Sequence, residues 1–233
     1  MAADDNRKPL LKRALRPLIP QRLLAERAVI HRLGPRAGRT YLKLRLLDAA
    51  GISASNRHRV HQHARSFLFI CYGNIMRSPM AELMFKRAIK QFGIEGVQAN
   101  SAGLHASPGT EAHPRAQIAA SELGLSLCDH RSQLLTGPMV QEADAIFAMD
   151  FQNKAELLSL FPQAERKIFM LGAYATGQGQ GCEIPDPFFG DQDEARRCYR
   201  VLQACIDNLA ESLRPRPQNA GEATSPQVVS TQV

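Results

Sequence analysis

A short apolar run that leads into a loop of defined composition constrains the fold more than any other feature of this chain. The run from Phe67 to Ile70 is continuous and bulky, which is typical of a strand buried in a parallel sheet. Pro79 and the strong helix formers behind it predict a helix near 79–92. The loop between them, residues 71–78, therefore opens onto a helix N-terminus, where backbone N–H groups can surround a tetrahedral anion. The pattern predicts a phosphate site.

The residue types in this loop suit chemistry on a bound phosphoryl group. Cys71 is a nucleophile in its thiolate form, which a helix N-terminus and a nearby arginine stabilise. The guanidinium of Arg77 stays charged and can hold two phosphate oxygens at once. Gly73 and Asn74 tolerate the left-handed backbone angles that curl a chain around an anion. The hydroxyl of Ser78 is placed to donate to the sulfur.

A carboxyl group is also needed, because the leaving oxygen takes up a proton and a later attack by water requires a base. Asp186 is the candidate, since it lies between Pro185 and Pro187 in a segment rich in glycine and proline that is typical of a loop. From the residues alone, an ordinary turn residue is the favoured interpretation of Asp186.

The chain resembles the low-molecular-weight protein tyrosine phosphatase family at these residues. Cys71 to Pro79 matches the family signature of Cys, any residue, Gly-Asn, any two residues and Arg-Ser-Pro. The similarity continues at Ser101-Ala102-Gly103, His113-Pro114-Arg115-Ala116, Asp129-His130-Arg131-Ser132-Gln133, Ala145 to Asp150 and Pro185 to Asp191. It implies one domain over 66–213, which leaves a basic extension over 1–65, either helical or partly disordered, and a disordered tail over 214–233.

The resemblance implies a phosphatase that hydrolyses phosphotyrosine or related aryl phosphates through a phosphocysteine intermediate. Cys71, Arg77 and Asp186 would be catalytic, and Ser101 and His130 would support the loop together with Asn74 and Ser78. Substrate-binding residues would be Tyr72, Gly73, Asn74, Ile75, Met76, Ser78 and Phe188. No metal or cofactor is expected, and His58, His61 and His63 are interpreted as solvated.

Some positions depart from the family pattern. Met76 stands where many relatives carry a second cysteine, so oxidised Cys71 cannot be trapped by a disulfide inside the loop. Ser107 falls about where an aromatic residue often flanks the pocket, and phenylalanines replace tyrosines at 188–189. Ile75 is similar to the tyrosine-specific members, because relatives that act on phosphoarginine tend to have threonine there.

Two other functions stay open as alternatives. Thioredoxin-coupled arsenate reductases share this fold and relay electrons through cysteines at and just after the end of the third strand. This chain reads Met149-Asp150-Phe151-Gln152-Asn153 there, without a cysteine. A phosphoprotein-binding module without turnover is the other alternative, which the presence of Cys71, Arg77 and Asp186 disfavours.

Strand and helix patterns alternate along residues 66–213. We expect strands at 66–71, 97–102, 144–149 and 167–171, and helices near 79–92, 112–124, 151–161 and 191–213. Such alternation predicts an α/β fold, a doubly wound parallel sheet with helices on both faces and the active loop at a carboxyl strand end. The family resemblance adds that the sheet has four strands.

Positive charge is concentrated in the extension. Residues 1–65 hold 15 Lys or Arg against four Asp or Glu, a net charge of +11 in a chain whose total is +7, so the remainder carries −4. Leu42, Leu46 and Leu47 fall on roughly one face of a predicted helix over 39–50, which Gly51 would end. This extension would bind an anionic membrane surface or an acidic partner, or would pack on the domain through those leucines.

The remaining partners and the location follow from composition. The five cysteines lack paired spacing, which indicates reduced thiols, and no apolar run is long enough to span a membrane. The expected location is cytoplasmic, with peripheral attachment to the membrane as an option. The expected partner is a phosphotyrosine protein substrate, and no nucleic acid is expected.

Overall fold

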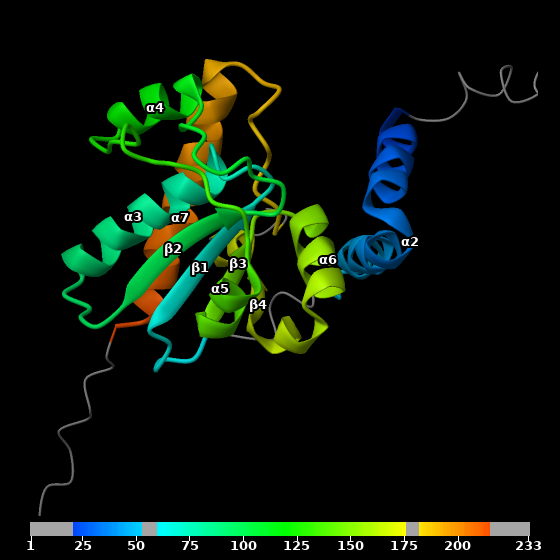
Figure 1. Cartoon of the computed structure of the whole chain (residues 1–233), viewed down its shortest axis with the longest axis horizontal. Coiled ribbons are helices and arrows are strands. Elements are labelled where there is room, and N and C mark those ends of the chain that lie inside the picture. Colours follow the sequence, from blue (N-terminus) through cyan, green and yellow to red (C-terminus); the bar gives the residue numbers. More distant parts are fainter. Residues whose placement is uncertain (1–20, 53–59, 176–181, 215–233) are drawn as a thin grey trace, which may run out of the picture.

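A parallel sheet of four strands lies at the centre of the structure. The computed structural model describes residues 21–52, 60–175 and 182–214. Its strands are β1 (Ser66–Cys71), β2 (Gln98–Gly103), β3 (Ala145–Ala148) and β4 (Ile168–Met170), in the order β2-β1-β3-β4 (Figure 1). All neighbouring pairs are parallel, so the carboxyl ends of the strands share one edge. The predicted four-stranded parallel sheet is confirmed.

Helices cover both faces of the sheet, as predicted. α3 (Arg77–Gln91), α4 (Pro114–Ser121) and α7 (Gln192–Ser212) pack on one face, and α5 (Gly137–Glu142) and α6 (Phe151–Leu160) pack on the other. Strand β1 shows why both faces are covered. Phe67 and Phe69 point into the core under α3 and α7, whereas Leu68 and Ile70 point into the opposite core. Apolar side chains on both sides of one strand require a layer on each side.

Some element bounds differ from the predicted ones. Helix α3 begins at Arg77, so the last loop residues belong to its first turn. Helix α4 ends at Ser121 rather than near 124. The short helix α5, which the sequence did not predict, starts after Thr136, whose hydroxyl accepts a hydrogen bond from the Met139 amide. Two 3₁₀ segments, η3 (Pro162–Lys167) and η4 (Leu171–Tyr174), flank β4.

The extension contains a long helix, α2 (Gln21–Ala49), that packs on the domain. It is kinked at Gly34, which has a left-handed φ of 72° and is followed by Pro35. The half after the kink lies along α6 and buries Ala37 and Tyr41 (Figure 1). In the described part of the chain, no helix combines the length and apolarity needed to cross a bilayer.

The face that α2 uses is not the predicted one. Leu42 and Leu46 are 46% and 62% exposed and Leu47 is half-buried, so in the alternative that packs the extension on the domain, Leu42 and Leu46 do not make the contact. Tyr41 takes that role because its ring is buried while its hydroxyl donates to Glu26 at 2.5 Å. Gly51 follows the helix with φ 68°, as the sequence predicted. The stretch before Gln21, the tail beyond Arg214 and His58 lie outside the described residues.

Candidate active site

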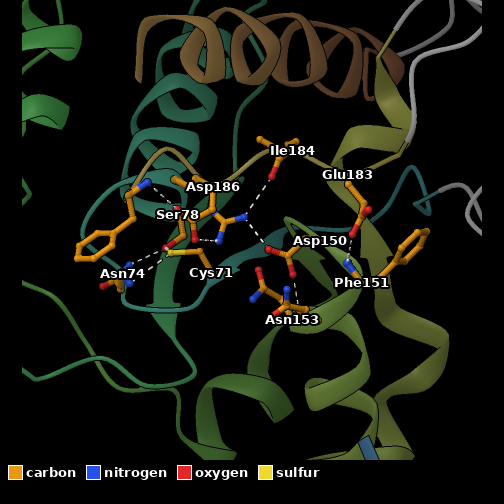
Figure 2. Close-up of polar contacts among 12 residues, drawn as sticks. Cys71, Asn74, Ser78, Asp150, Phe151, Asn153, Glu183, Ile184 and Asp186 are labelled. Carbon is orange, nitrogen blue, oxygen red and sulfur yellow. Dashed lines mark hydrogen bonds and ion pairs between the residues drawn. The ribbon is translucent and has the colours of Figure 1, made fainter. Parts of the chain in front are cut away.

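The loop after β1 curls around the sulfur of Cys71. The amide of Asn74 donates to Sγ at 3.2 Å, and the Ser78 hydroxyl lies 3.1 Å from Sγ (Figure 2). Asn74 has φ 53°, the only positive value among the described residues other than glycine, whereas Gly73 has none. Asparagine tolerates this conformation better than most side chains. One asparagine therefore sets the curl of the loop.

The side chain of Asn74 holds the loop in this conformation. Its Nδ2 donates to the hydroxyls of Ser78 and Ser101, both at 2.9 Å, and its Oδ1 accepts from the Gln133 amide at 2.8 Å. The ring Nε2 of His130 lies 2.7 Å from the Asn74 carbonyl oxygen. The structure thus brings together the four residues that the resemblance grouped, namely Asn74, Ser78, Ser101 and His130.

Gly103 lets β2 approach the back of the loop. A Cβ atom there would lie 2.8 Å from the carbonyl oxygen of Tyr72 and 2.9 Å from the amide nitrogen of Asn74. Contacts this short force the backbone to move. We expect Gly103→Ala to lower kcat/KM by roughly tenfold or more, because it displaces loop backbone that must stay aligned with the bound phosphate. Steady-state kinetics checks this, with Gly137→Ala as the control, because a Cβ at Gly137 would meet no atom within 4 Å and its φ is not positive.

Arg77 is buried among acceptors at the floor of the site. Its Nη1 donates to Asp150 Oδ2 at 2.7 Å and to the Ile184 carbonyl oxygen at 3.1 Å, and its Nη2 donates to Asp186 Oδ2 at 2.5 Å (Figure 2). Burial alone would lower the pKa of Arg77, but the carboxylates of Asp150 and Asp186 outweigh that effect and raise the pKa above its usual value. Arg77 is therefore a fixed cation.

Asp150 is a site residue that sequence reasoning missed. Its Oδ1 accepts from the Asn153 amide and caps α6, while its other oxygen binds Arg77. A signal was present, because Asp150 lies two residues after the end of β3 and the carboxyl ends of parallel strands share one edge.

Asp186 comes from the loop before α7. Its side chain is 41% exposed, against 17% for Asp150, and its Oδ1 accepts from the Phe188 amide at 3.1 Å. The start of this loop is tied to the sheet edge, because the Ile184 amide donates to Met149 at 2.7 Å. The start of the loop that carries Asp186 is thus fixed to the sheet, while the Asp186 carboxyl group remains accessible to solvent.

These groups open into one cavity of about 500 Å³. Tyr72 and His105 stack at 4.5 Å along one wall, and Phe188 stands on another. The pocket is thus less depleted of aromatic surface than the sequence indicated, because His105 and Tyr72 compensate for Ser107. Phe189 also lines the cavity but is 95% exposed. The remaining lining residues are Arg32, Cys71, Gly73, Ile75, Met76, Arg77, Thr110, Asp150, Gln152, Asn153 and Asp186.

No second thiol shares this cavity. Its lining contains Cys71 alone among the five cysteines, and Met76 occupies the position expected for a partner. Cys128 is exposed, and Cys182, Cys198 and Cys205 are buried, all unbridged. Within the described residues, no group of three or more metal-ligating side chains is present. The arrangement offers a nucleophile, a ring of hydrogen-bond donors, a fixed cation and a carboxyl group.

Comparison with known proteins agrees with this geometry. The family model for low molecular weight phosphotyrosine protein phosphatases matches residues 66–219. A protein-arginine-phosphatase of Bacillus subtilis is 36% identical over 147 residues, which covers 63% of this chain and 95% of that protein. The low molecular weight protein-tyrosine-phosphatase Ptp of Acinetobacter johnsonii is 31% identical over 142 residues, which covers 61% and 93%.

Solved structures show the same similarity. The tyrosine phosphatase AmsI of Erwinia amylovora superposes with a TM-score of 0.59 at 32% identity, covering 65% of this chain and 95% of that one. A YwlE mutant from Bacillus subtilis gives 0.60 at 34% identity, covering 65% and 100%. The chain is therefore a member of the low molecular weight phosphotyrosine protein phosphatase family, a family of cysteine-dependent protein phosphatases.

Proposed function

We propose that this phosphatase hydrolyses phosphotyrosine, or a related aryl phosphate, in protein substrates through a phosphocysteine intermediate. The observation that carries the proposal is the position of Cys71 Sγ, which the Asn74 amide and the Ser78 hydroxyl contact inside a loop at the N-terminus of α3. Donors directed at a sulfur stabilise its thiolate, and the same loop can accept phosphate oxygens. Residues 66–213 form the catalytic unit in this proposal, without a metal or cofactor.

The reaction proceeds in two steps. In the first step, Sγ of Cys71 attacks phosphorus and forms the S–P bond. Arg77 and the loop amides hold the phosphoryl oxygens during this attack. The ester P–O bond breaks, and Asp186 gives its proton to the leaving oxygen. Water then attacks the phosphocysteine, Asp186 takes the proton of that water, and the S–P bond breaks. The Ser78 hydroxyl donates to the departing sulfur. Asn74, Ser101 and His130 keep the loop in shape.

The walls of the cavity favour an aryl group. Ile75, Tyr72 and Phe188 present apolar and aromatic surface around Cys71, which suits the ring of phosphotyrosine. Gly73 and Met76 also line the cavity and belong to the proposed substrate site. Phosphoarginine is the second candidate, because relatives named protein-arginine-phosphatases are 36% and 35% identical to this chain.

The first test is hydrolysis of phenyl phosphate by the purified full chain. Turnover without added metal supports the proposal. Failure to release phosphate would favour a binding module, whereas arsenate-dependent oxidation of thioredoxin would favour a reductase. Asp150 to Asn153 follow β3 without a cysteine, which disfavours that last outcome.

Loss of the acid should depend on the leaving group. We expect Asp186→Asn to lower kcat on phenyl phosphate by roughly a hundredfold, because phenolate leaves poorly without a proton. On p-nitrophenyl phosphate, whose leaving group needs little protonation, the loss should be less than about tenfold. A Brønsted plot over substituted phenols measures the difference, and Asp193→Asn on the exposed start of α7 is the matched control. Equal losses on both substrates would remove Asp186 from the acid role.

Substrate choice should respond to Ile75. We expect Ile75→Thr to raise the ratio of phosphoarginine to phosphotyrosine turnover by roughly fivefold or more, because a smaller polar side chain removes the apolar contact with an aryl ring. Matched peptides that carry one or the other phosphorylated residue measure the ratio, and Ile118→Thr, at an exposed site on α4, is the control. If the unmutated protein turns over phosphoarginine faster than phosphotyrosine, phosphoarginine becomes the proposed substrate in place of phosphotyrosine.

The reduced thiols and the thiolate chemistry support a cytoplasmic location, which we include in the proposal. Attachment of the extension to an anionic membrane or an acidic partner stays a prediction, as does the absence of a nucleic-acid partner. Co-sedimentation with anionic and neutral vesicles at two salt concentrations checks membrane attachment.

A further inference from the structure

The helix α2 reaches the cavity that contains Cys71. Arg32 lines that cavity together with Cys71, although the two residues belong to different parts of the chain. The family model begins at residue 66, so α2 is additional to the part of the chain that the family defines. The extension therefore supplies a side chain to the candidate active site.

The position of Arg32 is fixed by contacts across the kink of α2. Glu26, before the kink, accepts from Tyr41 and from Arg45 after it, both at 2.5 Å. Gly38 lies so close to the preceding half that a Cβ there would be 2.9 Å from the Ile30 carbonyl oxygen. Because both halves are joined in this way, the direction in which Arg32 leaves the helix is set by the fold.

The second half of α2 is anchored to the acid loop. Arg45 Nη1 pairs with Glu183 at 2.8 Å. Figure 2 shows the second bond of Glu183, which accepts from the Phe151 amide at 2.9 Å. Glu183 precedes Asp186 by three residues, and Phe151 begins α6. The anchor thus joins α2 to two segments that line the cavity, the acid loop and the start of α6.

Within residues 21–52, 60–175 and 182–214, the guanidinium of Arg32 makes one polar contact. Its Nη2 donates to Gln152 Oε1 at 2.5 Å, and Gln152 follows Asp150 in the first turn of α6. Among the residues that the structure describes, no carboxylate pairs with Arg32. The other ionisable lining groups have partners, because Asp150 and Asp186 bind Arg77 and His105 lies 2.5 Å from Glu156. Arg32 therefore has guanidinium donors left for a ligand and, unlike Arg77, has no carboxylate partner among the described residues.

We propose that Arg32 forms an accessory anion subsite that binds a carboxylate of the substrate, namely an aspartate or glutamate side chain near the phosphorylated residue. This inference rests on the proposed function. A second guanidinium in the cavity can bind a second anionic group besides the phosphate. A small aryl phosphate has no such second group, whereas an acidic side chain of a protein substrate supplies one. The extension then sets which protein sites are dephosphorylated, while the loop and Asp186 perform the chemistry.

The test measures a ratio of rates. Phosphorylated peptides carry glutamate or glutamine at each flanking position in turn, with whichever phosphorylated residue the protein turns over faster. We expect the full chain to prefer a glutamate peptide by about threefold to fivefold in kcat/KM, the range of a partly exposed ion pair. Arg32→Gln should bring the ratio to about one, and Arg32→Glu should invert it. Arg32→Lys should keep part of the preference, and high salt should reduce it.

Arg39→Gln is the matched control, since Arg39 is exposed on the same helix and does not line the cavity. It should keep the preference. Turnover of the glutamine peptide shows that each variant is folded. A full chain without preference at any position, or a preference that survives Arg32→Gln and Arg32→Glu, overturns the subsite. Absence of phenyl phosphate hydrolysis by the full chain defeats the proposed function instead, so the two failures are distinct.

Discussion

Replacement of Cys71 by serine is expected to abolish hydrolysis of phenyl phosphate, with a loss of at least about a thousandfold in kcat. Serine puts a hydroxyl in place of the thiolate that the proposed mechanism uses, so the attacking atom loses its nucleophilic form. The contacts from the Asn74 amide and the Ser78 hydroxyl are directed at that atom, and no other cysteine lines the cavity. Release of inorganic phosphate over long incubations measures the residual rate.

Cys128→Ser is the control for this variant. Cys128 is exposed and lies outside the cavity, so we expect its replacement to leave kcat within about twofold, as for most exposed substitutions. A thermal unfolding curve shows whether either variant has lost its fold. A folded Cys71→Ser protein that keeps the parent rate would exclude the thiolate mechanism.

Replacement of Arg77 by lysine is expected to lower kcat/KM by roughly a hundredfold or more, although the positive charge remains. A lysine ammonium cannot present the planar pair of donors that reaches Asp150, Asp186 and the Ile184 carbonyl together. Loss of one preorganised donor to a transition-state oxygen costs a comparable factor in other enzymes. Kinetics on phenyl phosphate measures this, and a lower melting temperature should accompany it, because two carboxylates lose part of their partner.

Arg87→Lys is the matched control for Arg77→Lys. Arg87 is half-buried on α3 and donates to the Leu123 carbonyl and to Gln203, and none of these three residues lines the cavity. We expect this variant to keep activity and to show at most a modest loss of stability. Activity within a few-fold of the parent in Arg77→Lys would mean that a point charge suffices at this position.

The elements that the sequence predicted well are those in which one local pattern decides the outcome. Strand β1 has apolar side chains for both faces, and the residues after it have no alternative to a loop ahead of a helix. Asn74, Ser78, Ser101 and His130 could be grouped only through the resemblance, because their hydrogen bonds join segments that are far apart in sequence.

The features that the sequence did not predict depend on long-range packing. The spacing of Leu42 and Leu46 suggests a buried face, but the residues buried after the kink are Ala37 and Tyr41, whose hydroxyl donates to Glu26. The contact between Arg32 and Gln152 spans 120 residues, and Arg32 lies just before the kink at Gly34. No local propensity encodes such a contact.

The charge balance around Arg77 has a consequence for inhibitors. The guanidinium already has two carboxylate counter-ions, so an incoming phosphate must compete for it and displace at least one. Asp186 is the more exposed of the two, and Asp150 is held in place as the cap of α6. Binding of an oxyanion to Arg77 would thus displace the Asp186 carboxylate from this arginine. Neutral ligands leave both carboxylates bound, so they would fill the aromatic mouth of the cavity without opening its floor.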